Sequence, residues 1–265
     1  MKLYKEIIKI IIVLLVVHSC LFADNVYELK FARESAIIIP MFTLGAYSLI
    51  RSSNQTGLSE YELVNLSIYK INRFERFATQ NYCERSMLQS DFLLYACLIA
   101  PFLLNINNNV SGEFLEVNTV IVQSLLTSIA FTQLTKTTFL RNRPLAYNDS
   151  VPINIRRDKD ARYSFISGHT ALAFTGAMLT AKIYNDFHPY TNNTLVYATA
   201  ITTASTVGYL RMRAGKHFPS DVLAGAIVGT ASAFLITEMH RNVKCKMKND
   251  NSSRNAIPLH FQINF

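Results

Sequence analysis

The chain of 265 residues contains no tryptophan, four cysteines, nine glycines and seven prolines. The cysteines form no CxxC pair, which excludes a zinc ribbon and a redox dithiol site. Few glycines and prolines argue against a loop-rich β-fold. Charged residues make up 17% of the chain, below the usual quarter, so a large polar surface is not expected.

Half of the residues are hydrophobic, which excludes a disordered chain and is enough for one well-packed domain. Lysine and arginine number 26 against 18 acidic residues, a formal net charge of +8. A basic excess of this size indicates an anionic partner: a nucleic acid, an anionic lipid or a phosphate compound.

The first 23 residues have the layout of a secretory signal peptide. Lys2, Lys5 and Lys9 precede an apolar run from Ile10 to Val17, and Ala23 is a candidate for the last residue before cleavage. An uncleaved N-terminal anchor is the alternative. Either interpretation places the rest of the chain outside the cytoplasm of a bacterial cell.

Six apolar segments follow, and none alternates with the period of two that marks a strand. Each has 13 to 16 residues, short of the roughly 20 that a membrane-spanning helix needs, and together they cover 36–50, 92–104, 119–131, 171–184, 195–210 and 222–237. We expect an all-α bundle of about six core helices, either embedded in a membrane or soluble. The expected organisation is a helical region at 24–90, a core at 91–240 and a basic tail at 241–265.

Three basic clusters lie between these segments. The first runs from Lys136 to Arg143, the second contains Ser167-Gly168-His169, and the third runs from Arg211 to Asp221. Because successive helices alternate in direction, all three clusters are expected at one end of the bundle. Unpaired N–H groups at helix starts also favour an anion there, so the sequence predicts a site for a phosphate-sized oxyanion.

The third cluster also has a spacing suited to nucleophilic catalysis. His217 and Asp221 are four residues apart, so one helical turn brings the carboxylate within reach of one imidazole nitrogen. The other nitrogen is then free to attack. His169, at the start of another helix, is placed to protonate a leaving oxygen.

These motifs resemble those of the type 2 phosphatidic acid phosphatase superfamily, which includes class A acid phosphatases and vanadium haloperoxidases. Lys136-x6-Arg143-Pro144, Ser167-Gly168-His169 and Arg211-x5-His217-x3-Asp221 match its three motifs over roughly residues 90 to 238. Two positions depart from the pattern. Ile166 replaces the usual Pro, so a less rigid turn into the following helix is expected. Leu210 replaces the usual Ser, so weaker phosphate binding is expected.

The resemblance implies a role for each matching residue. His217 attacks phosphorus and forms a phosphohistidine, Asp221 orients it, and His169 is the general acid. The residues that the resemblance implies bind the phosphate are Lys136, Arg143, Ser167, Gly168 and Arg211. Three fixed cations take the place of a metal, so neither a metal nor another cofactor is expected. The neighbouring basic residues, Arg141 among them, are expected to rim the site as solvated loop charges.

The predicted function is a metal-independent phosphatase for phosphate monoesters or pyrophosphates, with a phosphorylated lipid as substrate and a periplasm-facing site. Phosphatidate-like lipids, polyprenyl pyrophosphate and lipid A are the candidates. The alternatives are a soluble periplasmic acid phosphatase acting on small phosphate esters, a haloperoxidase, and a non-catalytic membrane protein that binds anionic lipid. Nucleic-acid binding fits poorly, because the basic residues gather at one bundle end beside apolar helices. The sequence does not give the oligomeric state.

Overall fold

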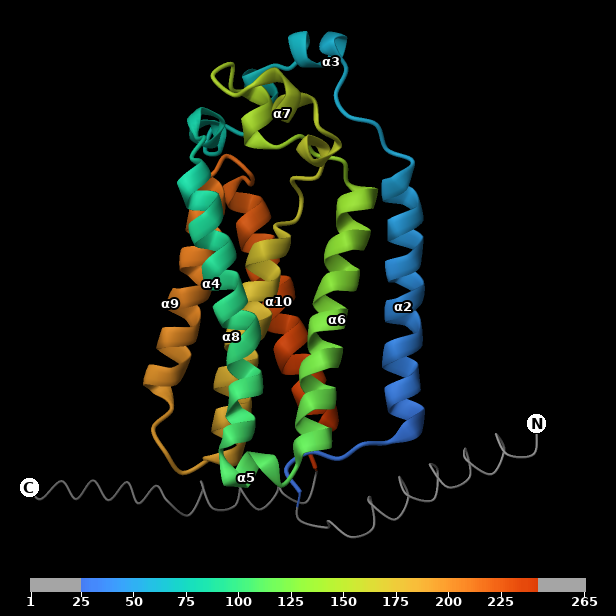
Figure 1. Ribbon diagram of the computed structural model, residues 1–265, viewed down its shortest axis with the longest axis vertical. Helices are drawn as coiled ribbons and strands as arrows, with labels where there is room; N and C mark the ends of the chain where they lie inside the picture. The colour runs from blue at the N-terminus through green and yellow to red at the C-terminus, as the bar shows by residue number, and fades with distance from the viewer. Residues whose placement is uncertain (1–24, 243–265) are drawn as a thin grey trace, which may run out of the picture.

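The computed structural model describes residues 25–242, and within this range the chain is helical, with two isolated β-bridges and no strand (Figure 1). The predicted signal or anchor at 1–23 lies outside the described residues. So does the predicted basic tail, apart from Arg241 and Asn242. The prediction of an all-α bundle with about six core helices is confirmed.

Six long helices form the bundle. They are α2 (Phe31–Ser53), α4 (Glu84–Leu103), α6 (Phe114–Thr138), α8 (Gly168–Phe187), α9 (Thr194–Arg213) and α10 (Pro219–His240). Each contains one of the apolar segments, except that the segment 92–104 extends one residue beyond α4. The helices have 20 to 25 residues and are longer than those segments. Backbone hydrogen bonding continues through the flanking polar residues, so the apolar segment gives only a lower bound. At 1.5 Å per residue the helices are about 30 to 38 Å long.

Helices of this length match the thickness of a bilayer. Four of them are long and apolar enough to cross a membrane: α2, α4 together with the 3-10 turn η3 (Leu104–Ile106), α6 and α10. Large apolar side chains also project from the bundle, such as Phe42 on α2, Phe92 on α4 and Leu223 on α10. Such surfaces suit lipid contact, and the protein is therefore a membrane-associated helical bundle.

Helix α8 lies at the centre of the bundle and packs against α4, α6, α9 and α10. Glycines allow the closest approaches. A β-carbon at Gly176 would lie 2.2 Å from the carbonyl oxygen of Cys97, and one at Gly225 would lie 2.6 Å from that of Ser167. Small residues of this kind let helix backbones come together. As a result the starts of α8 and α10 lie side by side.

Helix α2 packs on α6 at the edge of the bundle, and the helices end at common levels (Figure 1). The boundary predicted between residues 90 and 91 lies inside α4. At the far end of the bundle, the short helix α5 (Asn108–Ser111) links η3 to α6.

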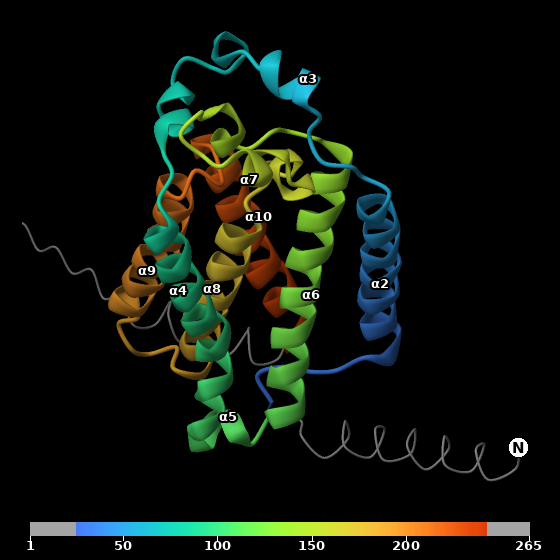
Figure 2. The ribbon, with the colours of Figure 1, turned by 45° about the horizontal axis from the view of Figure 1, so that its top comes forward.

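Short elements cover the end of the bundle where α4, α8 and α10 begin (Figure 2). We call these elements the cap. They are α3 (Glu60–Val64), η1 (Ile68–Lys70), η2 (Arg76–Gln80), η4 (Pro144–Tyr147), α7 (Ile153–Arg157) and η5 (Lys159–Arg162). The cap contains parts of the two long connections, α2 to α4 and α6 to α8. All three basic clusters lie beneath it.

Candidate active site

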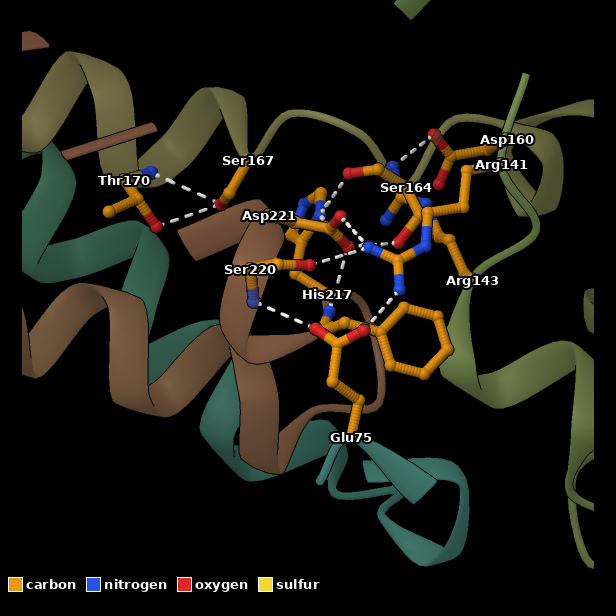
Figure 3. Close-up of polar contacts among 11 residues, drawn as sticks. Glu75, Arg141, Arg143, Asp160, Ser164, Ser167, Thr170, His217, Ser220 and Asp221 are labelled. Carbon is orange, nitrogen blue, oxygen red and sulfur yellow. Dashed lines mark hydrogen bonds and ion pairs between the residues drawn. The ribbon is translucent and has the colours of Figure 1, made fainter. Parts of the chain in front are cut away.

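The fold brings the three predicted clusters together at the capped end of the bundle. Lys136 lies in the last turn of α6, the Ser167–His169 segment opens α8, and Arg211 lies in the last turn of α9. His217 and Asp221 flank the start of α10. Figure 3 shows the polar contacts that surround His217 and Asp221.

His217 is held by a backbone carbonyl and makes no hydrogen bond to Asp221. Its Nδ1 lies 2.7 Å from the carbonyl oxygen of Ser164 and 3.9 Å from Oδ2 of Asp221. The predicted bond between the two motif residues is therefore absent. Because a carbonyl oxygen only accepts, Nδ1 carries the proton and donates it to Ser164. This tautomer leaves the Nε2 lone pair available for attack.

The surroundings of His217 also keep its ring neutral. The side chain is 1% exposed. Burial lowers the pKa of His217 well below 6.5, and the nearby cations Arg143, Lys136 and Arg211 lower it further. An uncharged imidazole with one free lone pair is the form that a nucleophile needs.

Asp221 is fully buried and organises the segments around His217. Its carboxylate accepts hydrogen bonds from the Ser164 hydroxyl at 2.5 Å, from Arg141 Nη1 at 2.5 Å and from the Phe218 backbone N–H at 2.8 Å. One of these donors, Ser164, also holds the imidazole through its carbonyl group. Asp221 thus acts on His217 through Ser164 and through the turn at Phe218.

Arg141 is a structural part of this cluster and not a solvated rim charge. Besides Asp221, it donates to Glu75 at 2.7 Å and to the Ser220 hydroxyl at 2.8 Å. Its guanidinium group lies 4.2 Å from the centroid of the Phe218 ring. Glu75 in turn accepts from the Ser220 backbone N–H at 2.9 Å. The cap is therefore tied to the first turn of α10 (Figure 3).

Arg143 and Arg211 are buried arginines with unused donors. Arg143 is 3% exposed and donates through Nη2 to Asp160 at 2.7 Å, while Arg211 is 6% exposed and donates through Nη1 to Ser90 and Asp91. Among the described residues, Arg143 Nε and Nη1 and Arg211 Nε are buried and have no hydrogen-bond partner. Unpaired buried donors are costly, and an anion between them would satisfy them.

Lys136 and Gly168 lie at the contact between α6 and the start of α8. A β-carbon at Gly168 would lie 3.4 Å from Lys136 Nζ and 3.2 Å from Cγ2 of Thr132. A side chain at residue 168 would therefore crowd the lysine. Glycine here keeps the start of α8 close to the cation, as a phosphate site requires.

Ser167 differs from its predicted role as a phosphate ligand. Its hydroxyl group lies 2.8 Å from Oγ1 of Thr170 and also accepts from the Thr170 backbone N–H, so it caps α8. The side chain is fully buried. Ser167 positions the helix start that carries Gly168 and His169.

His169 has a partner that no motif indicated. Its Nε2 lies 2.9 Å from Oδ1 of Asp91, and the same oxygen lies 3.3 Å from Arg211 Nη1. Asp91 comes from α4, which carries no recognisable motif. Sequence reasoning missed it because this contact joins residues 78 positions apart and depends on helix packing.

The two departures from the motif pattern are buried apolar side chains. Ile166 is 1% exposed in the loop that precedes α8, and Leu210 is 8% exposed on α9. Neither position carries a nucleophile or a charge. The six charged and imidazole groups of the three motifs (Lys136, Arg143, His169, Arg211, His217 and Asp221) all lie at the capped end.

Parts of this chain are similar to known proteins. The PAP2 superfamily matches residues 119–245. An undecaprenyl-diphosphatase of Sulfolobus acidocaldarius is 27% identical over 124 residues, covering 47% of this chain and 55% of the relative. A lipid A 1-phosphatase of Porphyromonas gingivalis is 41% identical over 76 residues, covering 28% of this chain and 16% of the relative. The chain thus spans about half the length of the first relative and less of the second.

A solved structure to which this chain is similar is a transmembrane PAP2-type phosphatidylglycerolphosphate phosphatase of Bacillus subtilis. It is 19% identical, with a TM-score of 0.44, and covers 78% of this chain and 94% of its own.

Proposed function

Residues 119–245 belong to the PAP2 superfamily, and on that premise we propose that this protein is a metal-independent lipid phosphatase. It hydrolyses phosphate monoesters or pyrophosphates through a phosphohistidine on His217. The observation that carries this proposal is the set of buried, unpaired guanidinium nitrogens on Arg143 and Arg211 beside a neutral, buried His217.

The proposed reaction has two steps. In the first, His217 Nε2 attacks phosphorus, the bond to the leaving oxygen breaks, and His169 gives that oxygen its proton. In the second, water attacks the phosphohistidine, gives a proton back to His169, and releases inorganic phosphate and free His217. Both transition states spread negative charge over the three equatorial oxygens, so the catalytic demand is mainly for positioning and charge neutralisation.

Three cations meet that demand in the proposal. Arg143 and Arg211 offer their unpaired nitrogens to the phosphoryl oxygens, and Lys136 adds a third positive charge beside Gly168. Removing any one of them leaves part of the developing charge without a partner. The arrangement needs no metal to supply positive charge.

A membrane lipid is the substrate that the fold supports best. Four helices are long and apolar enough to cross a bilayer, and exposed apolar side chains surround the bundle. The relatives named above act on a polyprenyl diphosphate and on lipid A. A soluble acid phosphatase has no need for such a surface. We place the protein in the bacterial cell envelope with its capped end toward the periplasm, in line with the export signal expected in residues 1–23.

The test is release of inorganic phosphate by the purified protein in detergent and EDTA. The panel holds phosphatidic acid, a polyprenyl diphosphate, lipid A and a soluble aryl phosphate, with His217→Ala as the paired variant. We expect release from at least one lipid by the wild-type protein alone. Equal release by His217→Ala, a strict need for Mg²⁺, or activity on the aryl phosphate alone would contradict the proposal. No release from a folded wild-type protein would favour a non-catalytic lipid-binding role.

A further inference from the structure

Two carboxylates flank the proposed phosphate site, one beside each buried arginine. Asp160 of the cap pairs with Arg143 at 2.7 Å, and Asp91 of α4 pairs with Arg211 at 3.3 Å. Both side chains are partly exposed, at 51% and 41%. The proposed phosphate site therefore has two buried positive charges, each paired with a partly exposed negative charge.

Asp91 lies on the side from which the leaving group departs. His169 is the proposed general acid for the leaving oxygen, and its imidazole ring contacts Asp91, with Nε2 2.9 Å from Oδ1. Any atom bonded to the leaving oxygen is therefore held within a few ångströms of the carboxylate. The chemistry of the leaving group decides whether this contact is tolerated.

The surface next to Asp91 is apolar. A groove of about 490 Å³ between α4 and α9 is lined by Leu88, Gln89, Phe92, Leu93, Thr206 and Leu210. It contains no cation that could balance a second phosphate. Leu210, the residue before Arg211, lines this groove at the position where the family pattern has a polar Ser. Figure 1 shows α4 and α9 side by side at this end of the bundle.

We propose that this protein prefers lipids whose phosphate is esterified to an uncharged alcohol over lipid diphosphates, and that Asp91 is the residue that sets this preference. The inference rests on the phosphatase activity proposed above. With a monoester, the proton from His169 converts the leaving oxygen into a neutral alcohol, and the hydrocarbon chain lies in the α4–α9 groove. With a diphosphate, the leaving group is itself a phosphate and meets the Asp91 carboxylate. Like charges at such a distance are strongly unfavourable.

A matched pair of substrates tests this preference. Farnesyl monophosphate and farnesyl diphosphate share one hydrocarbon chain and differ only in the leaving group. Initial rates are measured with the full chain in detergent and EDTA, and the lipid products are separated by chromatography. The variants are Asp91→Asn, which removes the charge and keeps the size, and Asp149→Asn as the control. Asp149 is a 95% exposed carboxylate in the cap that pairs with Arg156.

We expect wild-type kcat/KM to favour the monophosphate by roughly tenfold or more, and Asp91→Asn to narrow that ratio by roughly tenfold. Asp149→Asn keeps the wild-type ratio. Wild-type preference for the diphosphate would overturn the inference. So would an equal loss on both substrates in Asp91→Asn, which would show that Asp91 only positions His169. Release from neither substrate, or from His217→Ala as well, would instead contradict the proposed phosphatase activity.

Discussion

The Nδ1 atom of His217 lies 2.7 Å from the backbone carbonyl oxygen of Ser164, closer than any atom of the Asp221 carboxylate. A backbone group, and not the acidic residue of the motif, fixes the tautomer of the proposed nucleophile. The Ser164 side chain connects this carbonyl to Asp221 through its hydroxyl group. The tautomer of His217 therefore does not depend on a direct bond to Asp221. Substitutions can test the orientation of His217 and the structural role of Asp221 separately.

Substitution at Ser164 is expected to have a small effect. Ser164→Ala removes one hydrogen bond to Asp221 but keeps the carbonyl that orients His217. We predict a loss of kcat/KM of about tenfold or less, in line with about 1 kcal/mol for one hydrogen bond. A loss of more than about a thousandfold, measured on the preferred lipid, would show that the hydroxyl has a direct part in the reaction.

Asp221→Ala is expected to be more damaging than Ser164→Ala. It leaves Arg141, the Ser164 hydroxyl and the Phe218 N–H without their shared acceptor. Removing one partner of a buried charge pair typically costs about 3–5 kcal/mol of stability. We predict a clear fall in Tm together with lost activity. A variant that keeps the wild-type Tm would contradict the organising role given to Asp221.

The two buried arginines are expected to act mainly in the transition state. Arg143→Ala or Arg211→Ala should lower kcat by roughly 10² to 10³, as does loss of one oxyanion donor. Lysine should restore little at either position, because it lacks the fork geometry of the guanidinium. Arg157→Ala is the control, since the Arg157 side chain contacts Glu60 and the backbone carbonyl of Leu58 and none of the proposed catalytic residues, so it should keep wild-type kinetics.

His217 is expected to remain neutral at mildly acidic pH. Burial and three cations lower its pKa well below 6.5, so the ring loses its proton at a lower pH than a free histidine. The side-chain ¹⁵N spectrum at pH 6.5 should show the neutral tautomer with hydrogen on Nδ1, assigned by its loss in His217→Gln. A protonated ring at that pH would contradict both the pKa shift and the hydrogen bond to Ser164.

The same shift has a consequence for stability. In the unfolded chain His217 titrates near 6.5, whereas in the folded chain it binds its proton only at lower pH. The unfolded state therefore takes up more protons below pH 6.5, and stability falls as the pH falls through that value. Tm measured across this range should fall less in His217→Gln than in the wild-type protein. A steeper fall in the variant would reverse the assigned sign.

Glu75 is expected to hold the cap against α10. Its carboxylate accepts from both Arg141 and the Ser220 backbone N–H, and the residue is 9% exposed. Glu75→Ala should cost about 1–3 kcal/mol, the penalty for leaving such donors unsatisfied. Glu60→Ala removes an exposed partner of Arg157 and should cost close to nothing. Equal changes in Tm for the two variants would contradict a specific role for Glu75.

Local sequence signals predicted the helices and predicted that the motif residues gather at one end of the bundle. Apolar segments located all six long helices, and alternation of helix direction placed Lys136, His169 and His217 together. The segments underestimated helix length, because the polar residues around Asp91 and Lys136 continue the backbone hydrogen bonding. The first motif therefore ends a membrane-length helix.

The supporting contacts of the site could not be read from the sequence. Glu75 and Arg141 are 66 residues apart, and His169 and Asp91 are 78 apart. Their meeting depends on how the cap folds over the bundle and how α4 packs on α8. The four-residue spacing of His217 and Asp221 indicated a direct bond, but the carbonyl of Ser164 occupies that place. A backbone acceptor leaves no trace in the residue types of a motif.

The most direct test of the proposed mechanism is detection of phosphate on His217. The wild-type protein is mixed with its preferred lipid substrate, quenched within one turnover under alkaline conditions that preserve phosphohistidine, and digested for mass spectrometry. The proposed mechanism predicts a phosphate on the peptide that contains His217, its absence in His217→Ala, and its loss on acid treatment. Full turnover with no phosphate on His217, or phosphate on another residue in both proteins, would contradict it.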